Sequence, residues 1–148
     1  MIIVLFVICE GKIQFPDGAC YEGDFVDNEI DGFGEYIWPD GRSYKGDWKN
    51  NQMDGKGESL WPNGRRYKGE YVKDRQEGWG IYKWDDGRIY YGYWIKSLQH
   101  GRGIYITNED GKIKEIRGIW QEGIKIKEIS EGFEEILKLK KKDEEGLL

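Results

Sequence analysis

The amino-acid sequence repeats itself every 23 residues, and this period constrains the fold more than any other feature of the chain. The columns that keep the step are the tyrosines Tyr21, Tyr44, Tyr67 and Tyr90, the glycines Gly23, Gly46, Gly69 and Gly92, the tryptophans Trp38, Trp61 and Trp84, and the turn glycines Gly18, Gly41, Gly64 and Gly87. Because so many columns share one register, the chain is predicted to be an array of similar supersecondary units.

One unit of this period is typical of a β-hairpin. Tyr44 and Trp48 fall on one face of an extended segment, because strand side chains alternate. The aromatic enrichment favours strand over helix. Residues 50–55 are expected to form a polar loop between the two strands. Asp40-Gly41 predicts a turn to the next hairpin, because glycine tolerates the positive φ that such turns need.

The composition excludes several classes of protein. The aromatic content of 15% argues against a disordered chain. The longest apolar run, Ile2 to Ile8, is much shorter than the ~20 residues that cross a bilayer. A formal net charge of −5 argues against nucleic acid as a partner. The only cysteines, Cys9 and Cys20, make neither a disulfide framework nor a CxxC motif.

The repeat unit resembles the MORN repeat, and the resemblance extends from about Gly11 to Gly123. It rests on Tyr44-Lys45-Gly46-Asp47-Trp48 and Gly55-Lys56-Gly57, with a second match in Tyr67-Lys68-Gly69-Glu70-Tyr71 and Gly78-Trp79-Gly80. The expected fold class is therefore all-β: an elongated single-layer array of antiparallel β-hairpins with a C-terminal α-helix. Departures from the family pattern are Ser59, Thr107 and Ile116.

Three segments are expected along the chain. Residues 1–10 are an apolar N-terminal strand or half repeat, residues 11–126 are the hairpin array, and residues 127–148 are a charged amphipathic helix. Ser130 is a candidate N-cap and Gly146 a candidate end of that helix. The helix is expected to pack on the last repeat and cover its open edge. The alternatives are a docking helix for a partner and, less favoured, membrane binding through its lysines.

Few residues in the sequence carry catalytic chemistry. His100 is the only histidine, and it stands at the loop position that Asp31, Asp54 and Glu77 fill in other repeats. There is no nucleophile motif with a second histidine and no metal-ligand spacing. The sequence therefore predicts no enzyme activity, no cofactor, and no catalytic, cofactor-binding or metal-binding residue.

Two sets of residues are candidate binding sites. The first set is aromatic and is predicted to contact other proteins: Trp48, Tyr71, Trp84 and Trp94. These rings could equally be internal rungs of the array. The second set keeps the 23-residue step and consists of Arg42, Arg65 and Arg88. It could bind anionic lipid head groups. The favoured interpretation is instead structural: each arginine rests over a tyrosine ring and pairs with nearby acidic residues.

The family resemblance implies a non-catalytic scaffold or protein–protein interaction module within a larger cytoskeletal assembly, such as a ciliary axoneme. The expected partners are other proteins, including another MORN-repeat chain joined through array ends or edges, and the expected location is the cytoplasm, associated with the cytoskeleton. A membrane adaptor that binds phosphoinositides is the alternative. A carbohydrate or choline reader is a third hypothesis, disfavoured because the glycines of such repeats follow a different phase.

Overall fold

The computed structural model describes the backbone of residues 7–9 and 12–148, and the side chains of residues 13–148. The chain divides into two compact units, one ending at Asp74 and one beginning at Arg75. This division falls inside the expected array of residues 11–126. Of the N-terminal segment expected at residues 1–10, Val7–Cys9 form a short strand, and the rest lies outside the described residues.

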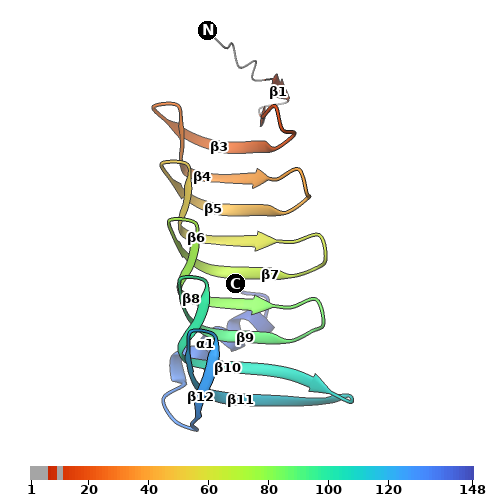
Figure 1. Cartoon of the computed structure of the whole chain (residues 1–148), viewed down its shortest axis with the longest axis vertical. Helices are drawn as coiled ribbons and strands as arrows, with labels where there is room; N and C mark the ends of the chain where they lie inside the picture. The colour runs from red at the N-terminus through yellow and green to blue at the C-terminus, as the bar shows by residue number, and fades with distance from the viewer. Residues whose placement is uncertain (1–6, 10–11) are drawn as a thin grey trace. The chain divides into compact units, whose positions relative to one another are not determined.

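In the first unit each strand from β1 to β6 pairs antiparallel with the strand that follows it in the chain, so the sheet order within the unit is the chain order (Figure 1). The strands are β1 (Val7–Cys9), β2 (Lys12–Gln14), β3 (Cys20–Val26), β4 (Glu29–Ile37), β5 (Ser43–Lys49), β6 (Gln52–Leu60) and β7 (Arg66–Val72). This arrangement confirms the prediction of antiparallel hairpins.

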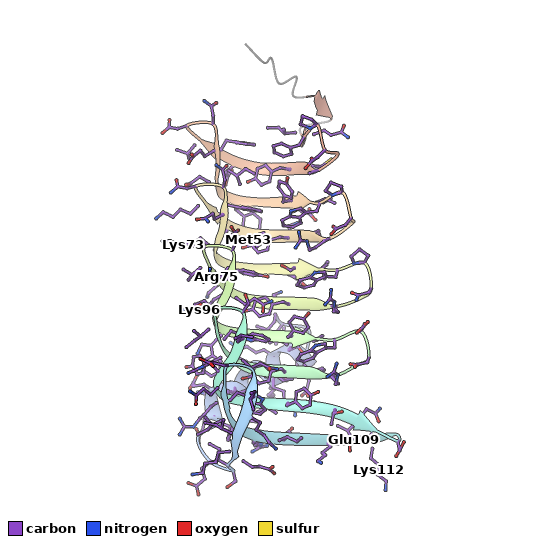
Figure 2. All side chains as sticks on the ribbon, in the orientation of Figure 1. Met53, Lys73, Arg75, Lys96, Glu109 and Lys112 are labelled. Atoms are coloured by element: carbon purple, nitrogen blue, oxygen red, sulfur yellow. The ribbon has the colours of Figure 1, made fainter. Side chains whose placement is uncertain are left out.

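The second unit continues the same pattern and ends in a helix. Its elements are β8 (Arg75–Lys83), β9 (Ile89–Ile95), β10 (Leu98–Glu109), β11 (Lys112–Gln121), β12 (Ile124–Glu128) and α1 (Glu134–Glu144). Each of these strands again pairs antiparallel with the next. The β10–β11 hairpin is longer than the others, and Glu109 and Lys112 mark its tip (Figure 2).

Two kinds of turn connect the strands within the two units. One kind contains two residues with positive φ, as in Asn50 (47°) and Asn51 (63°), which is the geometry of a type I′ hairpin turn. The expected polar loop at residues 50–55 is therefore wrong, because β6 already begins at Gln52. The other kind is the Trp-Pro-Asp-Gly-Arg turn, in which the Trp38 N–H donates to the Arg42 carbonyl at 2.8 Å.

The two faces of the first unit differ in chemistry. One face carries the repeated aromatic rings, with Tyr21, Tyr44 and Tyr67 buried. The other face carries charges of alternating sign on neighbouring strands: Glu35 pairs across the sheet with Lys45, and Glu58 with Lys68. The Lys45–Glu35 and Lys68–Glu58 ion pairs measure 4.0 and 3.9 Å between the charged atoms. Because these side chains are solvent-accessible, each pair contributes little to the stability of the fold. This face is a solvated surface.

Helix α1 covers a face of the second unit's sheet, not its edge, so the expectation that it caps the last repeat is corrected. Phe133 and Ile136 form one buried cluster with Ile81 of β8, Tyr91 of β9 and Ile104 of β10. In the first unit the corresponding sheet positions carry charged residues such as Glu58 and Lys68. The change from charged to apolar side chains at these positions is what places the helix.

The ends of α1 match the sequence prediction only in part. The helix begins at Glu134, later than the expected residue 127, because residues 124–128 extend the sheet as β12. Its N-cap is Phe133, without a side-chain cap hydrogen bond, so Ser130 is not the cap. Gly146 does end it: with φ 69° it donates to Asp143, and Leu147 donates to Lys142 at 2.8 Å, which is a Schellman motif.

Candidate functional site

The repeated Tyr-x-Gly and Gly-x-Gly elements build one structural device, here called the clamp, in which a tyrosine ring lies across a pair of glycines on adjacent strands. The Tyr44 ring lies across the paired glycines Gly46 and Gly57, and its hydroxyl donates to the Asp47 carbonyl at 2.9 Å. A Cβ at Gly57 would overlap the Tyr44 ring. Tyr21 and Tyr67 make the same hydrogen bond, at 3.0 and 3.1 Å. The glycine pattern therefore has a structural cause.

Three of the four aromatic residues predicted to contact partners are buried. The exposed fractions of Trp48, Tyr71 and Trp94 are 6%, 3% and 4%. The indole N–H of Trp48 donates to the Gly34 carbonyl at 3.1 Å, and that of Trp94 donates to the Gly80 carbonyl at 3.3 Å. The expectation that these three side chains form an exposed contact surface is wrong, because each packs edge-on against a clamp tyrosine.

Trp84, the fourth predicted contact residue, is half-buried and belongs to a different column. Together with Trp38 and Trp61, also half-buried, it occupies the first position of a Trp-x-x-Gly-Arg turn. In each of these turns the backbone N–H of the tryptophan donates to the carbonyl of the arginine four residues later, at 2.8, 3.0 and 2.9 Å for Trp38, Trp61 and Trp84. These turns all lie on the same side of their own unit, opposite the hairpin turns (Figure 1).

Each predicted lipid-binding arginine lies over the tryptophan of its own turn. The guanidinium carbons of Arg42, Arg65 and Arg88 stand 4.2, 5.3 and 5.1 Å from the ring centroids of the tryptophans four residues earlier. The packing interpretation needs two corrections: the rings are tryptophans and not tyrosines, and among the described residues Arg88 alone of the three arginines has an acidic partner for its side chain, Asp86. A guanidinium over an indole face is attracted by about 0.5–1 kcal/mol at an exposed site.

The polar partners of the three arginines differ. The Arg88 side chain donates to Asp86 at 2.6 Å and to the Tyr105 hydroxyl at 3.2 Å. The backbone N–H and guanidinium of Arg88 lower the pKa of the exposed Asp86 carboxyl. Arg65 donates from Nε to Asn63 at 3.2 Å. The Arg42 Nε is buried without a hydrogen-bond partner among the described residues. Each turn thus presents an aromatic ring and a cation held together.

The perturbed ionisable groups of the chain are mainly structural tyrosines. Burial, with a smaller effect of the Asp24 charge, raises the pKa of Tyr21 to about 12. Burial also raises the pKa values of Tyr44 and Tyr90 above the ordinary range. Their protonated hydroxyls are the donors that close the clamps. His100 lies within strand β10 and not in a loop, which corrects its expected place.

Among residues 7–9 and 12–148 no group of three or more His, Cys, Asp or Glu side chains could hold a metal ion. In the same part of the chain no helix is long and apolar enough to cross a membrane.

Comparison with known families decides what kind of repeat this is. The family model of the MORN repeat matches residues 21–41, 44–65, 67–87 and 90–108, which together exceed half of the chain. The chain belongs to the MORN-repeat family. A search of curated proteins found no match. The matched segments begin at or next to the four clamp tyrosines, so the MORN signature and the tyrosine–glycine clamp coincide. MORN repeats are commonly modules that interact with proteins or membranes.

The last repeat of this MORN array departs from the signature in a coupled way. Ile116 stands where the other repeats have the clamp tyrosine, and Glu128 stands where they have the second glycine of Gly-x-Gly. At that position, as at Gly34 and Gly57, the atoms nearest to an added Cβ belong to the preceding tyrosine ring. Since Ile116 lacks that ring, Glu128 is tolerated.

Sequence reasoning missed the contacts that join one hairpin to the next. At three hairpin turns the second residue docks on the preceding hairpin, 21 residues earlier. The Asn51 backbone N–H donates to the Ile30 carbonyl at 2.9 Å, and its side-chain oxygen accepts from the Ile30 N–H at 2.8 Å. Asp74 makes the same two contacts with Met53, and Ser97 makes them with Gln76. The signal in the sequence is a short polar side chain at these three positions, Asn51, Asp74 and Ser97.

Proposed function

We propose that this MORN-repeat chain is a non-catalytic scaffold subunit that binds other proteins through its Trp-x-x-Gly-Arg turns. The observation that carries the proposal is the repetition of a half-buried tryptophan with an arginine over its ring, at Trp38, Trp61 and Trp84. Tryptophan and arginine are the residue types that dominate binding energy at protein interfaces. The buried rings Trp48, Tyr71 and Trp94 act indirectly, by holding the sheet rigid.

The family resemblance supports a cytoskeletal assembly, such as a ciliary axoneme, as the setting of this scaffold. The partner chemistry that fits the turns is a protein segment with acidic and aromatic side chains. Carboxylates would pair with the arginines, and rings would stack on the indoles.

A phosphoinositide-binding membrane adaptor is the second candidate function, and the same arginines would carry it. Two observations weigh against it. Arg65 and Arg88 already donate to Asn63 and Asp86 within their own turns. The net charge of −5 opposes approach to an anionic membrane.

The test compares two triple variants of the full-length chain with the same change in charge. One variant replaces Arg42, Arg65 and Arg88 by glutamine. The control variant also introduces glutamine, at the exposed lysines of the hairpin-turn side: Lys49, Lys73 and Lys96. Tagged chains are recovered from the cells that express the protein, and the bound proteins are quantified. We expect a stoichiometric partner that the arginine variant loses and the lysine variant keeps.

Liposome sedimentation separates the two candidate functions. Vesicles with and without a phosphoinositide are mixed with the wild-type chain and with both triple variants. The scaffold proposal expects no binding that depends on the arginines. Lipid binding that only the arginine variant loses, together with no protein partner that depends on those arginines, would replace it by the adaptor function.

A further inference from the structure

Strand β12 ends the second unit with an open edge. All five of its residues, Ile124–Glu128, are exposed, and β11 is its only strand partner in the described part of the chain. Helix α1 packs on β8, β9 and β10 and does not extend the sheet. An open edge presents unpaired backbone N–H and carbonyl groups to any strand that approaches it.

The turn-docking contacts indicate which kind of structure could bind to this edge, namely a further hairpin with its turn. The residues that accept a following turn are Ile30, Met53, Gln76 and Gln99, each two positions after a hairpin turn. Lys125 holds the same place after the Glu122–Gly123 turn, opposite Trp120 as Met53 is opposite Trp48. No turn docks on Lys125 within the described residues. The place for one more hairpin is therefore open.

The β3–β4 hairpin has the matching features. Its turn residue Asn28 has the same positive φ (65°) as Asn51 but docks on no described residue. Phe25 is 41% exposed, whereas Trp48, which holds the same place in the next repeat, is 6% exposed. β2 pairs with β3 at Cys20 and Tyr21, and among the described residues β4 is the only strand that pairs with the later part of β3.

Charge and register favour these two edges for each other. In the first unit the residue before the second glycine lies opposite an acidic residue of the next strand, as Phe33 does with Asp47 and Lys56 with Glu70. Lys127 holds that place in β12, and Asp24 holds the acidic place in β3. A two-fold pair of β12 strands centred on Ile126 would instead put Lys125 opposite Lys127, which is unfavourable.

We propose that the β3–β4 hairpin of a second copy adds to the free edge of β12, with Asp24 of that copy opposite Lys127 and its Asn28 docked on Lys125. The contact is head to tail, so every copy keeps one free edge of each kind, and association is not limited to two copies by the contact itself. This inference uses residues other than the tryptophan–arginine turns and stands apart from the proposed function.

Sedimentation velocity of the full-length chain from low micromolar concentration upward tests the contact. We expect wild-type chains to form species larger than a dimer as concentration rises. Lys127→Glu and Asp24→Lys should each weaken association, on the order of tenfold or more, because each puts like charges opposite one another. An equimolar mixture of the two variants restores the complementary pairs and should associate as the wild type does.

Three controls keep the outcome decisive. Lys114→Glu makes the same charge change on β11 and should leave association unchanged. Asp24→Asn keeps the acceptor for the Phe33 N–H, which Asp24 now receives at 2.8 Å, while removing the charge. Far-UV circular dichroism confirms that each variant is folded. A wild type that stays monomeric, one that stops at a dimer, or a mixture that does not recover would overturn the proposal.

Discussion

At the residue scale the central feature is the tyrosine that lies across a pair of glycines. Its ring leaves no room for a Cβ on the facing strand, as Gly34 under Tyr21 and Gly57 under Tyr44 show. The same ring buries itself and donates its hydroxyl to a nearby carbonyl. The family signature is thus a steric requirement, and its loss at Ile116 is accompanied by the loss of the second glycine, at Glu128.

The clamp predicts a specific coupling between Tyr44 and Gly57. Gly57→Ala should lower the free energy of unfolding by about 1–3 kcal/mol, because the new methyl group overlaps the ring. In a Tyr44→Leu background the same substitution should cost less, by roughly 0.5 kcal/mol or more, because the ring is gone. Urea denaturation of the four chains gives the coupling. Strictly additive effects would show that the ring does not dictate the glycine.

The 23-residue period allowed the clamp positions to be predicted, but not which rings stay accessible. The alternation of side chains along a strand puts Tyr44 and Trp48 on the same face of the sheet. It does not tell whether other side chains bury that face. Trp48 is covered by rings of neighbouring strands, Tyr21 and Tyr36 among them. Trp84 is half-buried because its turn lies at the margin of the sheet. Such coverage comes from neighbours that are far apart in sequence.

At the element scale the informative case is α1. Its position follows from apolar residues on β8, β9 and β10 where other repeats carry charges. Asp143 fixes the C-terminal part of the helix: it accepts from the buried Tyr91 hydroxyl at 2.8 Å and from Lys83 at 2.9 Å. The amphipathic pattern predicted a helix, but the site it covers is encoded in the strands.

Asp143→Ala should destabilise the docked helix by about 1–3 kcal/mol, because the Tyr91 hydroxyl loses its acceptor in a buried place. Hydrogen exchange of the α1 amides, read by mass spectrometry, measures the effect. Lys138→Ala is the matched control on the same helix, since the Lys138–Glu135 pair is mostly exposed, and it should change little. Equal exchange in the two variants would contradict the assigned role of Asp143.

At the scale of the whole molecule the buried tyrosines make stability depend on alkaline pH. Burial raises the pKa of Tyr21 from 10.0 to about 12, and it raises those of Tyr44, Tyr90 and Tyr91 as well. A raised pKa favours the protonated form in the folded state. The resulting stability is complete below pH 10 and is lost as the pH rises through the folded-state values.

A titration with two readouts tests this pH dependence. The first readout is absorbance near 295 nm, which reports tyrosinate. It should show the exposed tyrosines ionising first. The buried tyrosines should ionise later, at pH of about 12 or above, together with the loss of the near-ultraviolet circular dichroism signal. Ionisation of all tyrosines near pH 10 with the fold intact would contradict the buried clamps.

The proposed function of the whole chain rests on which tryptophans a bound protein covers. Hydroxyl-radical footprinting of the free chain and of the chain captured with its native partner measures this residue by residue. We expect oxidation of Trp38, Trp61 and Trp84 to fall in the complex, while Trp48 and Trp94 react little in either state because they are already buried. Unchanged oxidation of the three turn tryptophans, with protection at the hairpin-turn side instead, would contradict it.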